Sequence, residues 1–263
     1  MHFQSKNYIN YFDNNQPIIY NQNAPMVNKY NLNNELYCSN HYDVPEEVDD
    51  YIVEYFKREQ IKDIIISPEL SQDVGSSHPV IQNIACFFDL NCGLDLSHIA
   101  KSALNTKYDA KCFPAVIMRI RKPKTTANIF KNGKIICAGA KTEEDAKKAT
   151  RKISRIIQKL GYKIRYNNFK ILNMVASCDV RFQIGLDPLN LLHSSFTTYD
   201  PEQFPGLFYK MADPLITILI FKSGKIILTG GKDKSNIDEA YNKILPVLKM
   251  FKKEIPNQNI IKQ

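Results

Sequence analysis

The pattern of hydrophobic and polar positions in the C-terminal two thirds of this chain occurs twice, at a spacing of 91 residues. Residues 113–141 read FPAVIMRIRKPKTTANIFKNGKIICAGAK, and residues 204–232 read FPGLFYKMADPLITILIFKSGKIILTGGK. Each copy has a Phe-Pro pair, an apolar run, a turn with proline and an Ile-Phe-Lys-x-Gly-Lys-Ile-Ile hairpin, a pattern typical of antiparallel strands. We therefore predict a duplicated unit with a β-sheet core.

Both faces of the predicted hairpin strands are apolar. Side chains alternate between the two faces of a strand, so Ala127 and Ile129 lie on one face and Phe130 lies on the other. The exposed face of an antiparallel sheet is usually polar. Either helices cover both faces, or one face is an apolar binding surface. Each copy contains only two amphipathic segments, enough for one face of a ten-stranded sheet, which favours a second face that stays bare.

The first helix of each copy is short and follows a long strand. In the first copy residues 80–88 form the strand, and the helix at 94–104 begins after the N-cap Asp95. In the second copy residues 170–180 form the strand, and we predict Asp187 as the N-cap with Pro188 at the first helical position.

The second helix of each copy is long and amphipathic. The first begins after Thr142 and has an apolar stripe formed by Ala146, Ala149, Ile153, Ile156, Ile157 and Leu160. The second begins after Asp233, is expected to kink at Pro246, and buries Ile237, Ala240, Ile244, Leu248 and Phe251. This order predicts an α+β fold in which two pseudo-symmetric repeats form a saddle, a curved antiparallel ten-stranded sheet with helices on its convex face.

The repeats are expected to span residues 80–163 and 164–253, followed by a tail at 254–263. Residues 1–79 form an N-terminal extension rich in Asn, Tyr and Gln, and most of it is predicted to be disordered because it shows no helical or strand period. Its exception is a candidate acidic helix at 45–63.

Charge separates this extension from the repeats. The whole chain has a formal net charge of +8, but residues 1–79 carry 12 acids and five bases, a net charge of −7, which leaves +15 for residues 80–263. A domain this basic favours nucleic acid as the partner over a merely solvated lysine surface.

Cysteine and histidine spacing indicates no cofactor and no metal. The six cysteines form no Cys-x-x-Cys pair and no spacing suited to zinc, so reduced thiols are the default interpretation. His78, His98 and His193 lie beside no paired acid or nucleophile, which argues against an enzyme. No stretch is long enough to span a membrane and the N-terminus lacks a signal pattern, so neither a membrane partner nor secretion is expected.

Seven runs of residues carry a resemblance to a known family. They are NCGLDL, AVIMRIRKPKTTANIF, GAK, RKISRIIQKLG, FKILNMVASCDV, SSFTTYDPEQFPGL and LIFKSGKIILTG. Together they resemble the core of the TATA-box-binding proteins over about residues 80–253, in both repeats. The resemblance implies a promoter-recognition subunit that bends A·T-rich DNA by seating its sheet on the minor groove and nucleates an initiation complex.

The resemblance also implies a set of DNA-binding residues. The Phe pairs that wedge between base steps are Phe113 with Phe130 and Phe204 with Phe221. Asn83 and Asn173 match the central asparagines. The groove floor matches at Ile136, Val175, Leu219, Ile227 and Thr229, and phosphate contacts match at Arg119, Lys134, Lys210 and Lys225.

The first repeat departs from the family pattern on its groove face. Ala85, Asn128 and Ala138 stand where the family usually has Val, Leu and Thr, and Pro114 replaces a small residue. The second repeat is closer to the pattern. We therefore expect the C-terminal half to dominate sequence preference.

Partner surfaces are implied as well, together with the RNA polymerase machinery. Asp200 and Glu202 match acidic residues that bind transcription factor IIB, although Gln203 replaces the family's Leu. A surface for transcription factor IIA is implied on the basic side of the helix that begins after Thr142, where a solvated face is the alternative: Lys147, Lys152, Arg155 and Lys159.

Three further hypotheses concern an alternative function, a contact within the chain and the compartment. A diverged scaffold or regulator with relaxed or no TATA specificity is the alternative function. The acids and aromatics of the candidate helix at 45–63 could imitate DNA and occupy the concave face within the same chain.

The Asn, Ile, Lys and Tyr usage fits an A·T-rich genome, and the divergence from the family suits a large DNA virus or a protist. The expected compartment is the nucleus for a cellular protein, and the cytoplasmic factory or virion for a protein of a large DNA virus.

Overall fold

A computed structural model describes residues 78–253 of the chain. Its first repeat contains β1 (Val80–Asp89), α2 (Leu96–Ser102), β2 (Thr106–Lys107), β3 (Ala115–Ile120), β4 (Thr125–Phe130), β5 (Lys134–Ala140) and α3 (Glu143–Lys159). The second repeat has the same order in β6 (Asn167–Asp179), α4 (Leu186–Leu192), β7 (Thr197–Thr198), β8 (Gly206–Met211), β9 (Ile216–Phe221), β10 (Lys225–Gly231) and α5 (Lys234–Met250).

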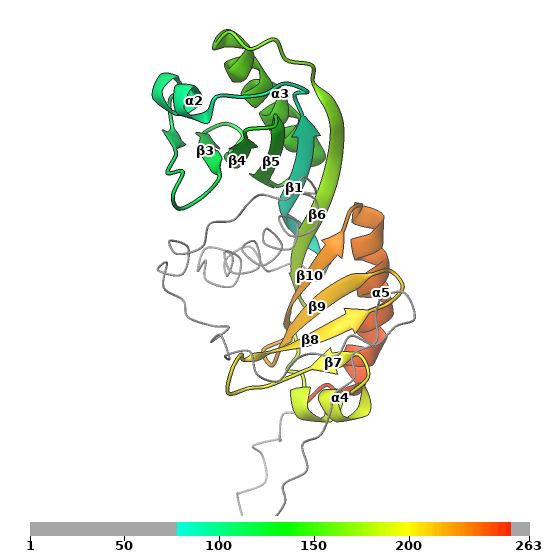
Figure 1. Ribbon diagram of the computed structural model, residues 1–263. Coiled ribbons are helices and arrows are strands. Elements are labelled where there is room, and N and C mark those ends of the chain that lie inside the picture. The colour runs from blue at the N-terminus through cyan, green and yellow to red at the C-terminus, as the bar shows by residue number, and fades with distance from the viewer. Residues whose placement is uncertain (1–77, 254–263) are drawn as a thin grey trace, which may run out of the picture. The chain divides into compact units, whose positions relative to one another are not determined.

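The ten strands form one antiparallel sheet in the order β2-β3-β4-β5-β1-β6-β10-β9-β8-β7. The two long strands β1 and β6 pair with each other at the centre, and each repeat then continues outward through its own hairpins (Figure 1). Each repeat also has a cis X-Pro bond at the equivalent turn, before Pro123 and before Pro214. The predicted α+β class with two repeats is confirmed.

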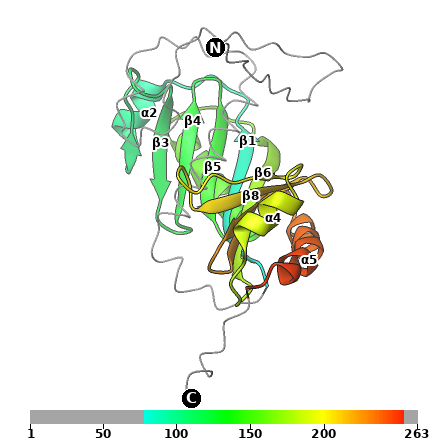
Figure 2. The ribbon, with the colours of Figure 1, turned by 90° about the horizontal axis from the view of Figure 1, so that it is seen from below.

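The described helices pack on one face of the sheet. α3 lies on β5 and β1, and α5 lies on β10 and β9 (Figures 1 and 2). Alternate strand residues such as Ile84, Ala127 and Ile129 join the helices in a core of the first repeat, and an equivalent core fills the second. The predicted alternation, with Phe130 on the other side of β4 from Ile129, is also confirmed.

Three of the four predicted helix caps are present. The Asp95 carboxylate accepts hydrogen bonds from the backbone N–H groups of Ser97 and His98. The Thr142 hydroxyl accepts one from Asp145, and the Asp233 carboxylate accepts one from Ser235. Each acceptor satisfies backbone donors that the first turn of a helix leaves unpaired. The predicted apolar stripe of α5 is buried, whereas that of α3 is buried except at Ile156 and Leu160, which are half-buried.

The predicted start of α4 is wrong. The N-cap is Gly185, without a side-chain cap, so Asp187 and Pro188 lie inside the first turn. The Gly185 N–H donates to the Phe251 carbonyl, and Ile184 bridges Lys252. This long-range contact with the end of α5 places the helix start, and proline is tolerated in the first turn because its missing N–H would have had no helical partner.

The predicted extent of α2 is also wrong, since the helix ends at Ser102 and the side chain of Leu104 is 86% exposed. The Thr106 hydroxyl donates to the carbonyls of Ala100 and Ala103, which satisfies acceptors that a continuing helix would use. Pro246 lies inside α5, and the kink expected there stays a prediction.

The predicted extension at 1–79 and the tail at 254–263 lie outside the described residues, apart from positions 78 and 79. Within residues 78–253, no helix combines the length and apolar character that a membrane-spanning helix requires. The same residues contain no group of three or more His, Cys, Asp or Glu arranged to hold a metal ion.

Candidate nucleic-acid interface

The second face of the sheet, called here the helix-free face, is the side on which none of the four described helices packs. It carries one apolar cluster in each repeat. The first cluster contains Ala115, Phe130 and Ile136, with Phe87, Phe113 and Leu172 packed against them. The second contains Val175, Leu219 and Ile227, with Phe204, Phe208 and Phe221 packed against them.

The floor of this face is more buried than expected. Val175 and Leu219 have no exposed surface, and Ile136 and Ile227 are 4% and 7% exposed. The face is thus free of helices within residues 78–253, as expected, but its floor residues are buried from solvent.

The four predicted wedge residues form two matched pairs on this face. The ring centroids of Phe113 and Phe130 are 6.3 Å apart at an interplanar angle of 60°. Those of Phe204 and Phe221 are 6.0 Å apart at 63°. Gly206 makes room for the second pair, because a Cβ there would lie 2.7 Å from the ring of Phe204. The rings of each predicted pair therefore lie together, and their role on DNA stays a prediction.

The central asparagines are held by backbone irregularities at the glycines of β5 and β10. The strand pairing skips Gly139 and Gly230, which have φ angles of 111° and 110°, where a side chain would be strained. Each bulged glycine donates its N–H over 2.8 Å, Gly139 to the Asn83 Oδ1 and Gly230 to the Asn173 Oδ1. Because Oδ1 faces a backbone donor, the NH₂ group of each side chain points away from that glycine.

The two asparagines differ in their second contact. The Asn173 Nδ2 lies 3.1 Å from the Thr229 Oγ1, which is buried with it. The residue of β5 equivalent to Thr229 is Ala138, 91 positions earlier, which has no hydroxyl. Asn173 is 1% exposed, whereas Asn83 is half-buried. The second repeat therefore fixes its central amide more firmly than the first.

The four predicted phosphate-binding cations surround the clusters on the same face. Arg119 on β3 opposes Thr126, and Lys210 on β8 opposes Thr217, and directly opposed residues share a face. Lys134 and Lys225 precede Ile136 and Ile227 by two positions, so they project from the face of those floor residues. Arg119 and Lys210 are exposed, and Lys134 and Lys225 are half-buried. The arrangement suits an apolar surface with a cationic rim.

The predicted partner surfaces are partly occupied by local contacts. The Asp200 carboxylate accepts a hydrogen bond from the Glu202 N–H, and both side chains are exposed. On α3, Lys147 lies 3.9 Å from the Glu143 carboxylate. Lys152 donates to the Lys122 carbonyl, while Arg155 and Lys159 are exposed. Lys152 therefore secures the turn after β3, as the equivalent Lys243 does at Asp213 over 2.9 Å.

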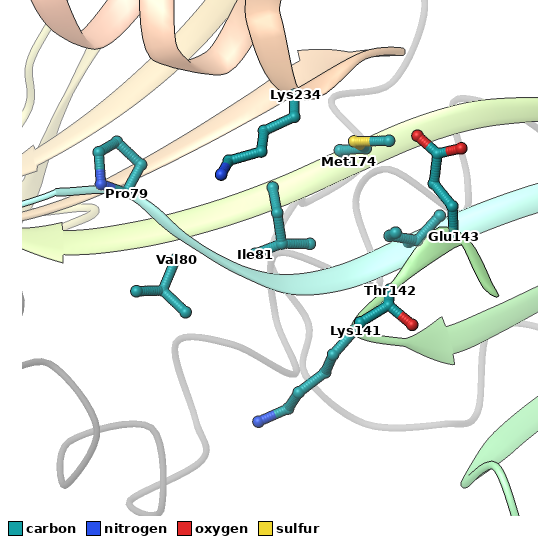
Figure 3. A pocket seen from close by; sticks show the side chains of 9 residues that line it. Pro79, Val80, Ile81, Lys141, Thr142, Glu143, Met174 and Lys234 are labelled. Carbon is teal, nitrogen blue, oxygen red and sulfur yellow. The ribbon is translucent and has the colours of Figure 1, made fainter. Parts of the chain in front are cut away.

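A pocket lies where the N-termini of α3 and α5 meet β1 and β6 (Figure 3). Its charged side chains are Lys141, Glu143 and Lys234. The hydroxyl of Thr142, which also lines it, accepts the helix-capping hydrogen bond. The pocket brings no nucleophile together with a base, so it does not suggest a reaction.

Five residues of the helix-free face were missed by sequence reasoning. Ala115, Phe87 and Leu172 belong to the first cluster and Phe208 to the second, while Ser177 lies on β6 in line with Asn173 and Val175. Counting in steps of two from the central asparagines finds Phe87 and Ser177. Counting in steps of two does not find Leu172, because the register of the β1–β6 pair shifts at its position.

Residues 78–160 and 168–251 match the model of one protein family, described as "Transcription factor TFIID (or TATA-binding protein, TBP)". The TATA-box-binding protein of Spodoptera frugiperda is 55% identical over 176 residues, which cover 67% of this chain and 57% of that protein. The TATA box-binding protein-like 2 of Rattus norvegicus is 54% identical over 175 residues, 66% of this chain and 51% of the relative. The chain thus spans little more than half the length of these relatives.

The solved structure of Methanococcus jannaschii TBP matches the fold with a TM-score of 0.60 and 36% sequence identity. The match covers 66% of this chain and 99% of that one.

Proposed function

Since the chain belongs to the TATA-box-binding protein family, we propose that it is a transcription initiation factor that binds A·T-rich promoter DNA in the minor groove. The observation that carries this proposal is the helix-free face itself. It combines two Phe pairs, two central asparagines and four cations on one side of a sheet whose other side holds the helices. An apolar surface with a cationic rim suits the shallow, sugar-lined surface of an opened minor groove.

The Phe pairs act as wedges in this proposal. Each pair enters one end of the site, partly unstacks a base step and kinks the duplex, as is known for this family. Unstacking costs a few kcal/mol per step, and the contacts that a bent duplex makes with the sheet offset it. Insertion of Phe130, which is 4% exposed, requires its ring to turn out of the first cluster.

The asparagines select A·T pairs. An A·T pair offers only the adenine N3 and thymine O2 acceptors in the minor groove, whereas G·C adds the guanine N2 amino donor. The Asn83 NH₂ points away from the backbone N–H that holds its oxygen, so it is oriented to donate. A guanine amino group would oppose this donor and crowd the apolar floor. Arg119, Lys134, Lys210 and Lys225 would bind phosphates, which sets affinity and salt dependence rather than sequence choice.

Recruitment of other factors forms the second part of the proposal. In this proposal Asp200 and Glu202 bind a transcription factor IIB-like partner, and the exposed Arg155 and Lys159 bind a IIA-like partner, which leads to the RNA polymerase machinery. The two sequence relatives named above, from Rattus norvegicus and Spodoptera frugiperda, are TATA-box-binding or TATA-box-binding-like proteins of animals, so we propose the nucleus as the compartment. The proposed role is binding rather than catalysis. The proposed repeat boundaries remain 80–163 and 164–253.

A direct test measures binding and bending of an A·T-rich duplex by the full chain, with fluorophores at the two DNA ends. We expect tight binding with a large decrease in end-to-end distance, and weak, salt-sensitive binding without bending on a G·C duplex. Phe196→Ala is a matched control, because Phe196 is 50% exposed and stacks on Tyr209 outside both clusters. Equal binding to both duplexes would reject this function and favour the alternative, a diverged scaffold or regulator of relaxed specificity.

A further inference from the structure

Two positions of the helix-free face are related by the internal repeat but carry different chemistry. Ile136 of β5 pairs with Phe87 of β1. Ile227 of β10, which lies 91 residues after Ile136, pairs with Ser177 of β6. Phe87 and Ser177 therefore occupy equivalent places in the two halves. An aromatic ring stands in the first half where the second half has a hydroxyl group.

The neighbours across the central strand pair differ in the same way. Phe87 opposes Lys170, and Ser177 opposes Val80. Opposed residues of antiparallel strands project from the same face, and Figure 3 shows Val80 and Ile81 on opposite sides of β1. One end of the β1–β6 pair thus presents a phenyl ring beside an exposed ammonium group. The other end presents a hydroxyl beside Val80, whose side chain is 42% exposed.

The Ser177 hydroxyl is buried without a hydrogen bond. Its residue is 7% exposed, and within residues 78–253 its Oγ is the single buried side-chain oxygen or nitrogen that lacks a hydrogen-bond partner. Its chain neighbours Ala176 and Cys178 point into the helix-covered core, so Ser177 points to the helix-free face. An unsatisfied buried hydroxyl destabilises a fold, and native proteins contain few of them. Packing alone therefore does not explain a serine here.

We propose that Ser177 is a sequence-reading residue, which donates its hydroxyl proton to a base acceptor in the minor groove under the second repeat. At the equivalent place of the first repeat, Phe87 supplies apolar contact instead, and Lys170 binds a phosphate. The acceptor is adenine N3 or thymine O2, the polar groups that an A·T pair presents in that groove. The inference rests on the proposed DNA-binding function and adds to it a pair of unlike subsites.

The different subsites at Ser177 and Phe87 favour one orientation of the protein on its DNA site over the other. The acceptors of an A·T pair are nearly the same whichever strand carries the adenine, so two identical halves would bind a site equally well in both directions. A hydroxyl at one end and a phenyl-ammonium pair at the other make the two directions unequal in energy. The direction in which the protein sits then decides on which side of the site its partner surfaces, including Asp200, are placed.

The test uses the full chain and A·T-rich duplexes in which single adenines are replaced by 3-deazaadenine, which has a C–H group in place of the N3 acceptor. For the wild type, replacement at one position of the half-site under the second repeat should weaken binding about 3- to 10-fold, the effect of one hydrogen bond. Ser177→Ala should bind the natural duplex more weakly by the same factor and should no longer respond to that replacement. Ser195→Ala, an exposed serine outside the face, is the matched control.

Two further measurements separate a reading role from a structural one. Ser177→Ala should keep or raise the unfolding midpoint, because it removes an unsatisfied buried group, whereas loss of a structural serine would lower the midpoint. Phe87→Ser should create a response to 3-deazaadenine in the first half-site. A Ser177→Ala protein that binds like the wild type and responds to the same replacements overturns the inference. A wild type that neither binds nor bends A·T-rich DNA would instead overturn the proposed function together with it.

Discussion

The two repeats of this protein have the same order of elements but different helix-free faces. In the second repeat, Thr229 contacts the central Asn173, and Gly206 leaves room for the ring of Phe204. In the first, Ala138 and Ala115 stand at those places. The helix-covered faces of both repeats are tightly packed and apolar. The two halves are therefore alike where they pack against helices and differ on the face that we propose to bind DNA.

The largest expected effect comes from removing the second wedge pair. Phe204→Ala with Phe221→Ala should lower affinity for an A·T-rich duplex about 100-fold, the scale for removing two aromatic anchors of an interface, and should abolish bending at one end of the site. The measurement is a bending and binding assay with single fluorophores at each DNA end. The matching first-repeat variant, Phe113→Ala with Phe130→Ala, should lose bending at the other end with a smaller loss of affinity. Equal losses in both variants would contradict a dominant second repeat.

The acidic extension should weaken DNA binding if it competes for the cationic rim. Residues 1–79 carry a net charge of −7 and the rest of the chain +15. Deletion of residues 1–76 is expected to raise affinity about tenfold at low salt, because the phosphates no longer compete with carboxylates for the same cations. The control is the full chain with Asp49→Asn and Asp50→Asn, which should give part of the gain. Unchanged affinity and salt dependence after the deletion would reject the hypothesis of intramolecular DNA imitation.

Removal of the Thr229 hydroxyl, which contacts the central Asn173, should change sequence preference by less than the two preceding changes alter affinity. Thr229→Ala frees the Asn173 amide and should relax the preference for A·T in the second half-site about 3- to 10-fold, within the range for one hydrogen bond. Ala138→Thr should strengthen the preference for A·T pairs in the first half-site. Binding to duplexes with single base-pair changes provides the measurement. For the wild-type protein, equal losses of affinity for base-pair changes in the two half-sites would contradict the expectation that the second repeat dominates sequence preference.

The smallest effects should come from the cationic rim. Lys210→Gln or Arg119→Gln removes one phosphate contact and should weaken binding to all sequences alike, with a decrease of about 1 in the slope of log affinity against log salt. Lys152→Gln is the comparison, since Lys152 is engaged with the Lys122 carbonyl and lies outside the proposed DNA surface. A change in sequence preference for Lys210→Gln would show that this lysine reads bases.

The pattern of apolar and polar residues predicted much of this structure, because strand alternation and helix caps depend on residues that lie close together in the chain. The alternation of Ala127, Ile129 and Phe130 follows from strand geometry, and the caps at Asp95, Thr142 and Asp233 follow from the unpaired N–H groups of a first helical turn. The start of α4 was missed because it depends on Gly185 meeting the Phe251 carbonyl, a contact between residues far apart in the chain.

The amino-acid sequence by itself determined the duplication, the α+β class and the apolar second face. The duplication is visible as a pattern repeated after 91 residues, and the other two follow from the local alternation of apolar and polar residues. Only the tertiary structure decided which groups meet on that face. It placed bulged glycines against asparagines 56 and 57 residues away, buried the floor residues Val175 and Leu219, and left the Ser177 hydroxyl unsatisfied. Strand register and bulges bring such residues together, and no local period encodes them.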